Sequence, residues 1–260
     1  VFSMQQIQQF IQQVKDYEFL QKALTTSVIV GVIAGILGCF IILRGLALMG
    51  DAISHAILPG VAISYMMGTN FFIGAAITGF ITALLIGLVQ QSSRIKSDAA
   101  IGIVFSSFFA IGVILIQMAQ SATDLTEILF GNILTVQDSD RNITMVIGVI
   151  VIILVVAFYK ELLITTFDPT MAAAWGYPTK LIHYGIMVTL TLVTVASLQA
   201  VGAILVVALL ITPASTAYLL TNNLRNMLIL SAIFGVISSV VGLYISFVIN
   251  VPSGAAIVSC

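Results

Sequence analysis

The sequence predicts an all-α membrane protein, a polytopic transmembrane helical bundle of about eight spans. Of the 260 residues, 60% are hydrophobic and only 7% are charged, and the mean hydropathy is +1.18. A soluble domain carries about 25% charged residues. This composition excludes a soluble globular domain, and the net charge of −1 provides no basic field for binding nucleic acid.

Residues 1–20 are expected to form an amphipathic interfacial helix before the first span. Ile7, Phe10, Ile11 and Val14 recur at helical spacing against a glutamine-rich face. A polar tail is the alternative, and no cleavable signal peptide is visible. The chain begins without an initiator Met and stops inside the apolar run AAIVSC, so we expect further residues at one or both ends.

Residues 21–260 are expected to form the transmembrane domain. A helix needs about 20 mostly apolar residues to cross the hydrocarbon core. This rule predicts spans at 22–43, 46–67, 71–91, 99–119, 142–160, 180–198, 200–220 and 227–249. The connections at 44–45, 68–70 and 199 are so short that neighbouring spans must form antiparallel hairpins.

The basic residues predict the orientation of these spans. One set of loops holds Arg44, Arg94, Lys96, Lys160, Lys180 and Arg225, whereas the other holds only Lys15, Lys22 and Arg141. The positive-inside rule places the first set in the cytoplasm. The segment 120–141 is then external. Its carboxylates would attract a cation or a docking protein, or it is an ordinary solvated loop.

The cytoplasmic segment 161–179 contains a predicted short helix at about 168–178. Asp168 is a favourable N-cap, and Pro169 occupies the first turn. Ala172 and Ala173 are small, and Gly176 and Pro178 end the helix. Small side chains allow another protein surface to approach closely, although a bare connector is the alternative.

Asp51 and His55 are the candidate metal ligands. They lie inside the predicted span 46–67 and four residues apart, which places them one turn apart on one helix face. A charged carboxylate at this depth costs roughly 2.5–3.5 kcal/mol, which a bound cation would offset. Carboxylate and imidazole together suit manganese, iron or zinc. A purely internal pair that stabilises helix packing is the alternative.

One aspartate and one histidine are too few ligands for a stable metal site. A twofold dimer would bring two such pairs to its axis and supply four ligands. The chain also lacks a GxxxxGK[ST] phosphate loop, so any ATP must be handled by a partner. It lacks an HExxH motif, and Cys39 and Cys260 are too far apart in sequence for a CxxC metal pair.

The run MGDAISHAILPGVAISY resembles the signature of the membrane permeases of bacterial ABC importers for manganese, zinc and iron. The runs VGAILVVALLITPASTAYLL and FDPTMAAAWG resemble the same family, in the same order. The resemblance implies a multi-pass permease of the bacterial plasma membrane that forms a homodimer. It also implies two cytoplasmic ATP-binding subunits and an extracellular or periplasmic metal-binding protein as partners.

The resemblance also assigns residues. Asp51 and His55 match the metal-pathway residues of the family, and the 168–178 helix looks like the coupling helix that docks into the ATPase. The coupling residues would be Asp168, Pro169, Ala172, Ala173 and Gly176. No permanently bound cofactor is implied, because the metal ion is the transported cargo.

The expected function is therefore ATP-driven import of a divalent transition-metal ion by a transport subunit that is not itself an enzyme. Oxygen and nitrogen ligands without cysteine favour manganese. Zinc or iron import by the same mechanism, and a secondary transporter or channel without an ATPase, are the alternatives. An intramembrane metalloenzyme would need more ligands and a general base than this chain supplies.

Overall fold

The computed structural model describes residues 8, 12, 14, 16–92, 94–118 and 137–260, which form helices and no strand. Seven of these helices are long and apolar enough to cross a membrane: α2 (Glu18–Leu43), α5 (Phe71–Ser92), α6 (Ser97–Met118), α8 (Asp138–Ala157), α11 (Thr179–Val201), α12 (Ala203–Leu220) and α13 (Leu224–Ile249). The prediction of an all-α polytopic bundle is confirmed. The predicted interfacial helix at 1–20 and the external segment at 120–141 fall largely outside the described residues.

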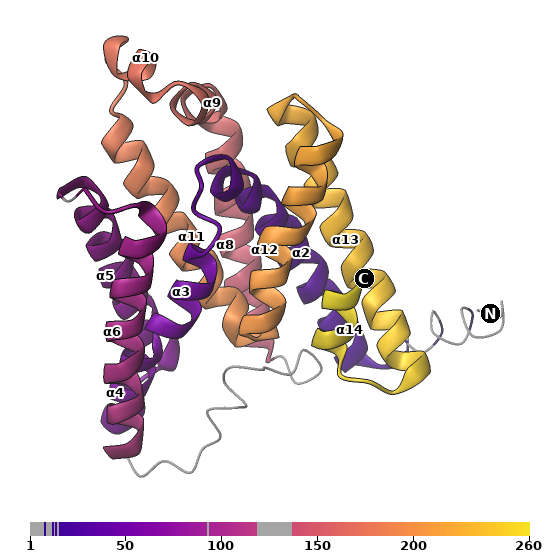
Figure 1. The fold of residues 1–260 in the computed structure, drawn as a ribbon. Coiled ribbons are helices and arrows are strands. Elements are labelled where there is room, and N and C mark those ends of the chain that lie inside the picture. Colours follow the sequence, from indigo (N-terminus) through magenta and orange to yellow (C-terminus); the bar gives the residue numbers. More distant parts are fainter. Residues whose placement is uncertain (1–7, 9–11, 13, 15, 93, 119–136) are drawn as a thin grey trace.

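The second predicted span, 46–67, is divided into two short helices, α3 (Met49–Ala56) and α4 (Leu58–Met67). Pro59 lies in the first turn of α4 and has no N–H to donate to the carbonyl of His55. The helix is therefore interrupted at Ile57, whose carbonyl accepts a hydrogen bond from the Thr78 hydroxyl of α5 at 3.3 Å. Taken together, α3 and α4 run along the bundle as the eighth span (Figure 1).

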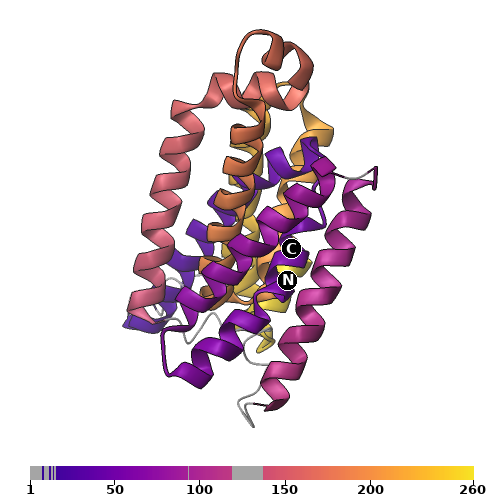
Figure 2. The ribbon, with the colours of Figure 1, turned by 90° about the vertical axis from the view of Figure 1, so that its left-hand side faces the viewer.

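Three further short helices complete the described chain: α9 (Tyr159–Phe167), α10 (Pro169–Ala174) and α14 (Ser253–Ser259). The helix α9 lies across one end of the bundle, and α10 is the outermost helix at that end (Figures 1 and 2). We call this end the α10 end. The predicted span 142–160 ends early, at Ala157, because α9 turns away and carries Lys160 and Glu161 along the surface.

The central helix of the bundle is α2, which contacts α8, α11, α12 and α13. Of its most apolar stretch, 67% is buried, against 56% or less for the other six membrane-length helices. The segments that carry the six basic residues of the predicted cytoplasmic set all lie toward the α10 end (Figure 1). The alternation of spans therefore agrees with that grouping of charges.

Small residues bring α2 and α13 into close contact. The Ser231 hydroxyl donates to the Gly35 carbonyl at 2.7 Å, and the Ser239 hydroxyl donates to the Ser27 carbonyl at 2.9 Å. A Cβ added at Gly31 would lie 2.6 Å from the carbonyl oxygen of Gly235. Backbone proximity and interhelical hydrogen bonds of this kind stabilise helix pairs in a membrane, where the hydrophobic effect between helices is absent.

We expect Gly31→Ala to destabilise the protein by about 1–3 kcal/mol, because the added methyl group forces α2 and α13 apart. Gly185→Ala on α11 is the matched control, since its Cβ would meet no atom within 4 Å. Alanine is the better helix former, so the control should be neutral or slightly stabilising. Unfolding midpoints of the two variants in detergent test the difference; equal midpoints would contradict the close α2–α13 contact.

Candidate metal site

The short helix α3 positions the two candidate ligands. Asp51 lies in its first turn and His55 in its last, and Nε2 of His55 is 3.5 Å from Oδ1 of Asp51. The other side of α3 is buried against the bundle through Met49, Ile53 and Ala56. This helix lies about midway between the two ends of the bundle (Figure 1).

The separation of the two side chains suits a shared metal ion. Ligand atoms about 2.0–2.2 Å from one metal, at tetrahedral or octahedral angles, lie about 3.0–3.5 Å from each other. The 3.5 Å between Asp51 and His55 is at the upper end of this range, and an i,i+4 pair needs little movement to close it. The pair could therefore bind one dication without refolding α3.

Within one chain the pair is only partly covered. The side chain of Asp51 is 51% exposed and that of His55 is 28% exposed. Among the described residues, no three His, Cys, Asp or Glu side chains lie close enough together to hold a metal ion. A metal ion held by this pair would therefore need further ligands from another chain, from water or from both.

Two aromatic side chains of α6 fix the imidazole. The ring of His55 lies 5.8 Å from that of Phe105 and 5.9 Å from that of Phe109, the second in an edge-on arrangement. Its Nδ1 is buried and makes no hydrogen bond to the part of the chain that the structure describes. The ring thus presents Nε2 toward Asp51, which leaves Nε2 as the nitrogen available to a metal. Sequence reasoning missed both phenylalanines, whose i,i+4 spacing on an apolar span carries no distinguishing signal.

The predicted coupling residues lie together on α10 and its flanks. Oδ1 of Asp168 accepts hydrogen bonds from the Met171 N–H at 2.8 Å and from the Thr170 hydroxyl at 2.7 Å, so Asp168 is the N-cap. Ala172 is fully buried, whereas Ala173 is exposed. Gly176 has a φ of +85°, a conformation that favours glycine, and it ends the helix.

The cap of α10 has a defined pH dependence. The Met171 N–H and the Thr170 hydroxyl lower the pKa of Asp168, because both donate to the ionised carboxylate. A lowered pKa in the folded state stabilises α10 at neutral pH, and that contribution is lost as the pH falls below the ordinary value of 3.8. We expect the amides of 170–174 to lose protection from hydrogen exchange in this range, after correction for intrinsic rates. Asp168→Asn keeps an acceptor oxygen but has no titrating group, so the protection of its α10 amides should not depend on pH in this range. Protection in the wild type that is equally independent of pH would contradict the role of Asp168 as the cap.

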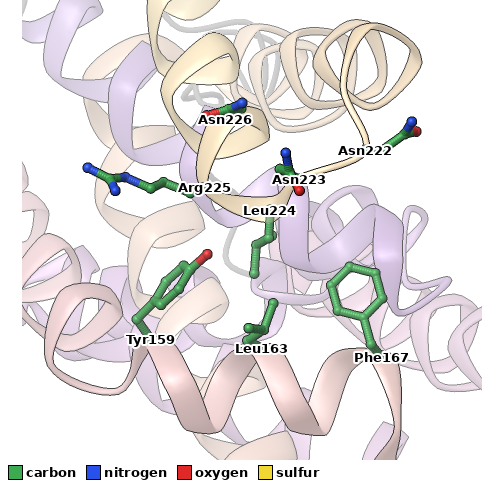
Figure 3. Close-up of a pocket in the computed structure, with 8 residues that line it drawn as sticks. All are labelled: Tyr159, Leu163, Phe167, Asn222, Asn223, Leu224, Arg225 and Asn226. Carbon is green, nitrogen blue, oxygen red and sulfur yellow. The ribbon is translucent and has the colours of Figure 1, made fainter.

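A separate cavity of about 470 Å³ lies at the α10 end, between α9 and the start of α13. Tyr159, Leu163 and Phe167 project into it from α9, opposite the residues 222–226 (Figure 3). Its lining has no carboxylate, imidazole or thiol. This cavity therefore lacks the side chains that usually hold a transition-metal ion, and α3 remains the candidate site.

A bundle of membrane-length helices, with a carboxylate and an imidazole on one face of an interrupted span, is the structure of a polytopic membrane protein. Comparison with known proteins gives the family. The chain belongs to the ABC 3 transport family, which it matches over residues 16–260. As a permease of that family it is a transport subunit, and ATP hydrolysis belongs to a separate subunit.

Individual relatives agree with this assignment. The manganese transport system membrane protein MntC of Listeria monocytogenes is 62% identical over 249 residues, which cover 96% of this chain and 89% of that protein. The manganese import system permease protein ScaB of Streptococcus gordonii is 54% identical over 97% of this chain and 91% of its own length. The solved structure of PsaBC from Streptococcus pneumoniae in complex with Fab contains a chain that is 54% identical, with a TM-score of 0.87 over 97% of this chain and 91% of that chain. The predicted family resemblance is confirmed.

Proposed function

We propose that this chain is the permease of an ATP-driven importer that carries manganese across the bacterial plasma membrane, with Asp51 and His55 as metal ligands on the path. The observation that carries the proposal is the 3.5 Å pair on α3. A carboxylate and an imidazole inside a hydrophobic bundle are costly unless they have a functional partner, and a dication is the partner that both prefer.

The choice of manganese rests on two arguments. The relatives MntC and ScaB are named for manganese transport. The ligand set is also oxygen and nitrogen, without a thiolate that would select softer ions. Zinc and iron accept the same ligands, so their exclusion is a matter for experiment.

We infer that the complete site forms between two copies of the chain. Leu48, Asp51 and His55 share one face of α3, and both Leu48 and the Asp51 side chain are 51% exposed in a single copy. A twofold axis along this face would bring together two carboxylates and two imidazoles. The two carboxylate charges would then balance one dication, and the partner would cover the open face.

The remaining partners follow from what the chain lacks. With no phosphate-binding loop in its sequence, it needs an ATPase subunit, one for each permease copy. We place the docking site at α10 and its flanks, where Asp168, Pro169, Ala173 and Gly176 are exposed and the buried Ala172 holds the helix against the rest of the chain. A metal-binding protein would deliver the ion at the opposite end of the bundle.

In the mechanism that we propose, the Asp51/His55 pairs hold the ion while the two ends of the path open in turn. ATP binding draws the ATPase subunits together and displaces α10. The interruption of the helix at Ile57, imposed by Pro59, allows α3 to reorient without moving all of α4. The ligands of the ion would be carboxylate oxygens and imidazole nitrogens. Water replaces such ligands readily enough for the ion to leave inward.

Transport by the reconstituted importer tests the function. The permease, its ATPase and its metal-binding protein are placed in liposomes, and uptake of radioactive manganese is measured with and without ATP. We expect ATP-dependent uptake of manganese, which an equal concentration of zinc or iron should inhibit only weakly. Uptake without ATPase would favour a secondary transporter or channel, and stronger uptake of zinc or iron than of manganese would overturn the choice of metal.

A further inference from the structure

Arg44 stands at the junction between α2 and the loop that leads into α3. The end of α2 is fixed by Gly45, which has a φ of +67°. The Gly45 N–H donates to the Ile42 carbonyl at 3.1 Å, and the Leu46 N–H donates to the Ile41 carbonyl at 2.8 Å. These two bonds form a Schellman motif, which ends a helix in a defined geometry. The backbone position of Arg44 is therefore set by this turn.

The guanidinium of Arg44 contacts two other helices. Its Nη2 donates to the Thr165 hydroxyl at 3.0 Å, and its Nε donates to the Thr166 hydroxyl at 3.2 Å, both on α9. Its Nη1 lies 3.5 Å from Nδ1 of His183 on α11. The Thr165 hydroxyl in turn donates to the Glu161 carbonyl at 2.7 Å, so its lone pairs remain free to accept from the arginine.

These contacts differ from those of an arginine that only marks membrane orientation. Such a residue directs its charge to water or lipid headgroups. Arg44 is instead partly buried, and it forms no ion pair with any carboxylate among the described residues. Its planar fork of donors bonds to two threonine hydroxyls and lies beside the imidazole of His183, a set of contacts that the single ammonium of lysine does not reproduce.

Thr165, Thr166 and His183 lie on the two helices that flank the proposed coupling helix. α9 leads into α10 through Asp168, and α11 begins four residues before His183, at Thr179. On its own side, Arg44 precedes Asp51 by seven residues, through the loop into α3. The side chain therefore joins both flanks of α10 to the segment that carries the metal ligands.

We propose that Arg44 is a positioning residue that couples the movement of α10 to α3, so that displacement by the ATPase reaches Asp51 and His55. This inference rests on the proposed function. α11 also packs directly against α3, which gives the same displacement a second route through apolar contacts. Loss of Arg44 should consequently reduce coupling and leave metal binding intact.

The test uses the complete importer in liposomes and measures manganese uptake for each ATP hydrolysed. Arg44→Ala removes the fork, and Arg44→Lys keeps the charge but not the fork. The double variant Thr165→Val with Thr166→Val keeps the arginine and removes two acceptors. Lys96→Ala, an exposed basic residue in the loop before α6, controls for the loss of one positive charge at this end.

We expect Arg44→Ala and the threonine double variant to lower the uptake per ATP on the order of 5- to 150-fold, the usual range of coupling between sites. Arg44→Lys should not rescue, Lys96→Ala should match wild type, and all variants should bind manganese as wild type does. Combining Arg44→Ala with the threonine changes should add little further loss. If Arg44→Lys, or a folded threonine double variant, took up as much manganese for each ATP hydrolysed as wild type does, the proposal would be overturned. Failure of wild type itself to take up manganese would instead contradict the proposed function.

Discussion

Asp51→Asn should abolish manganese uptake by the importer while leaving the permease folded. Asparagine has the shape of aspartate but lacks its charge, so the site between the two copies would lose both of the negative charges that balance the ion. Changes outside the ligand shell alone cost roughly 10–100-fold in metal affinity, and loss of a ligand charge should cost at least as much. Folding should survive, because the substitution removes a group that disfavours membrane insertion by roughly 2.5–3.5 kcal/mol.

Metal analysis of the purified variant and uptake in liposomes measure this effect. Asp98→Asn provides the matched control, since Asp98 is an exposed carboxylate in the first turn of α6. The control should bind and transport manganese as wild type does. Normal uptake by Asp51→Asn would remove Asp51 from the path, and with it the assignment of His55.

The sequence was sufficient for those parts of the molecule that depend on local chemistry. The cap of α10 follows from Asp168 and Pro169, which favour the first turn of any helix. The pairing of Asp51 with His55 follows from their four-residue spacing, and the structure places them 3.5 Å apart. Helical spacing fixes such distances within one turn, whatever the rest of the chain does.

Features that depend on packing between distant segments were not predictable in this way. Pro59 was visible in the sequence, but the contact of the Thr78 hydroxyl of α5 with the Ile57 carbonyl, where span 46–67 is divided, was not. The contact of His55 with Phe105 and Phe109 depends on α6 lying beside α3. The bonds from Arg44 join residues more than 120 positions apart. The pattern of residues within one segment does not predict which distant helix will pack beside it.

The boundaries of α11 and α12 illustrate the same limit. The sequence placed the connection at residue 199, whereas α11 continues to Val201 and the junction is Gly202. Gly202 has a φ of +86°, which permits the chain to leave one helix and begin the next without a longer loop. The run from 181 to 220 contains no Asp, Glu, Lys or Arg, so charge and hydropathy alone did not locate the break.

The second large effect concerns the proposed coupling helix. Ala173→Arg should weaken docking of the ATPase subunit, because Ala173 is an exposed small residue on the outermost helix of the α10 end. A long cationic side chain in a close-packed contact costs roughly 1–3 kcal/mol, which corresponds to a loss of about 5- to 150-fold in affinity. Binding of the purified ATPase to the permease in detergent measures this loss, and ATP-driven uptake should fall with it.

Thr69→Arg is the matched control for that substitution. Thr69 is also exposed, but it lies in the turn between α4 and α5 at the opposite end of the bundle. It receives the same bulk and charge, so any general effect of an added arginine on folding or insertion would appear in both variants. Binding of the ATPase should be weakened only by Ala173→Arg. Equal affinity in the two variants would place the ATPase elsewhere on the α10 end, because an interface that covers α10 cannot accommodate an arginine at Ala173 without moving.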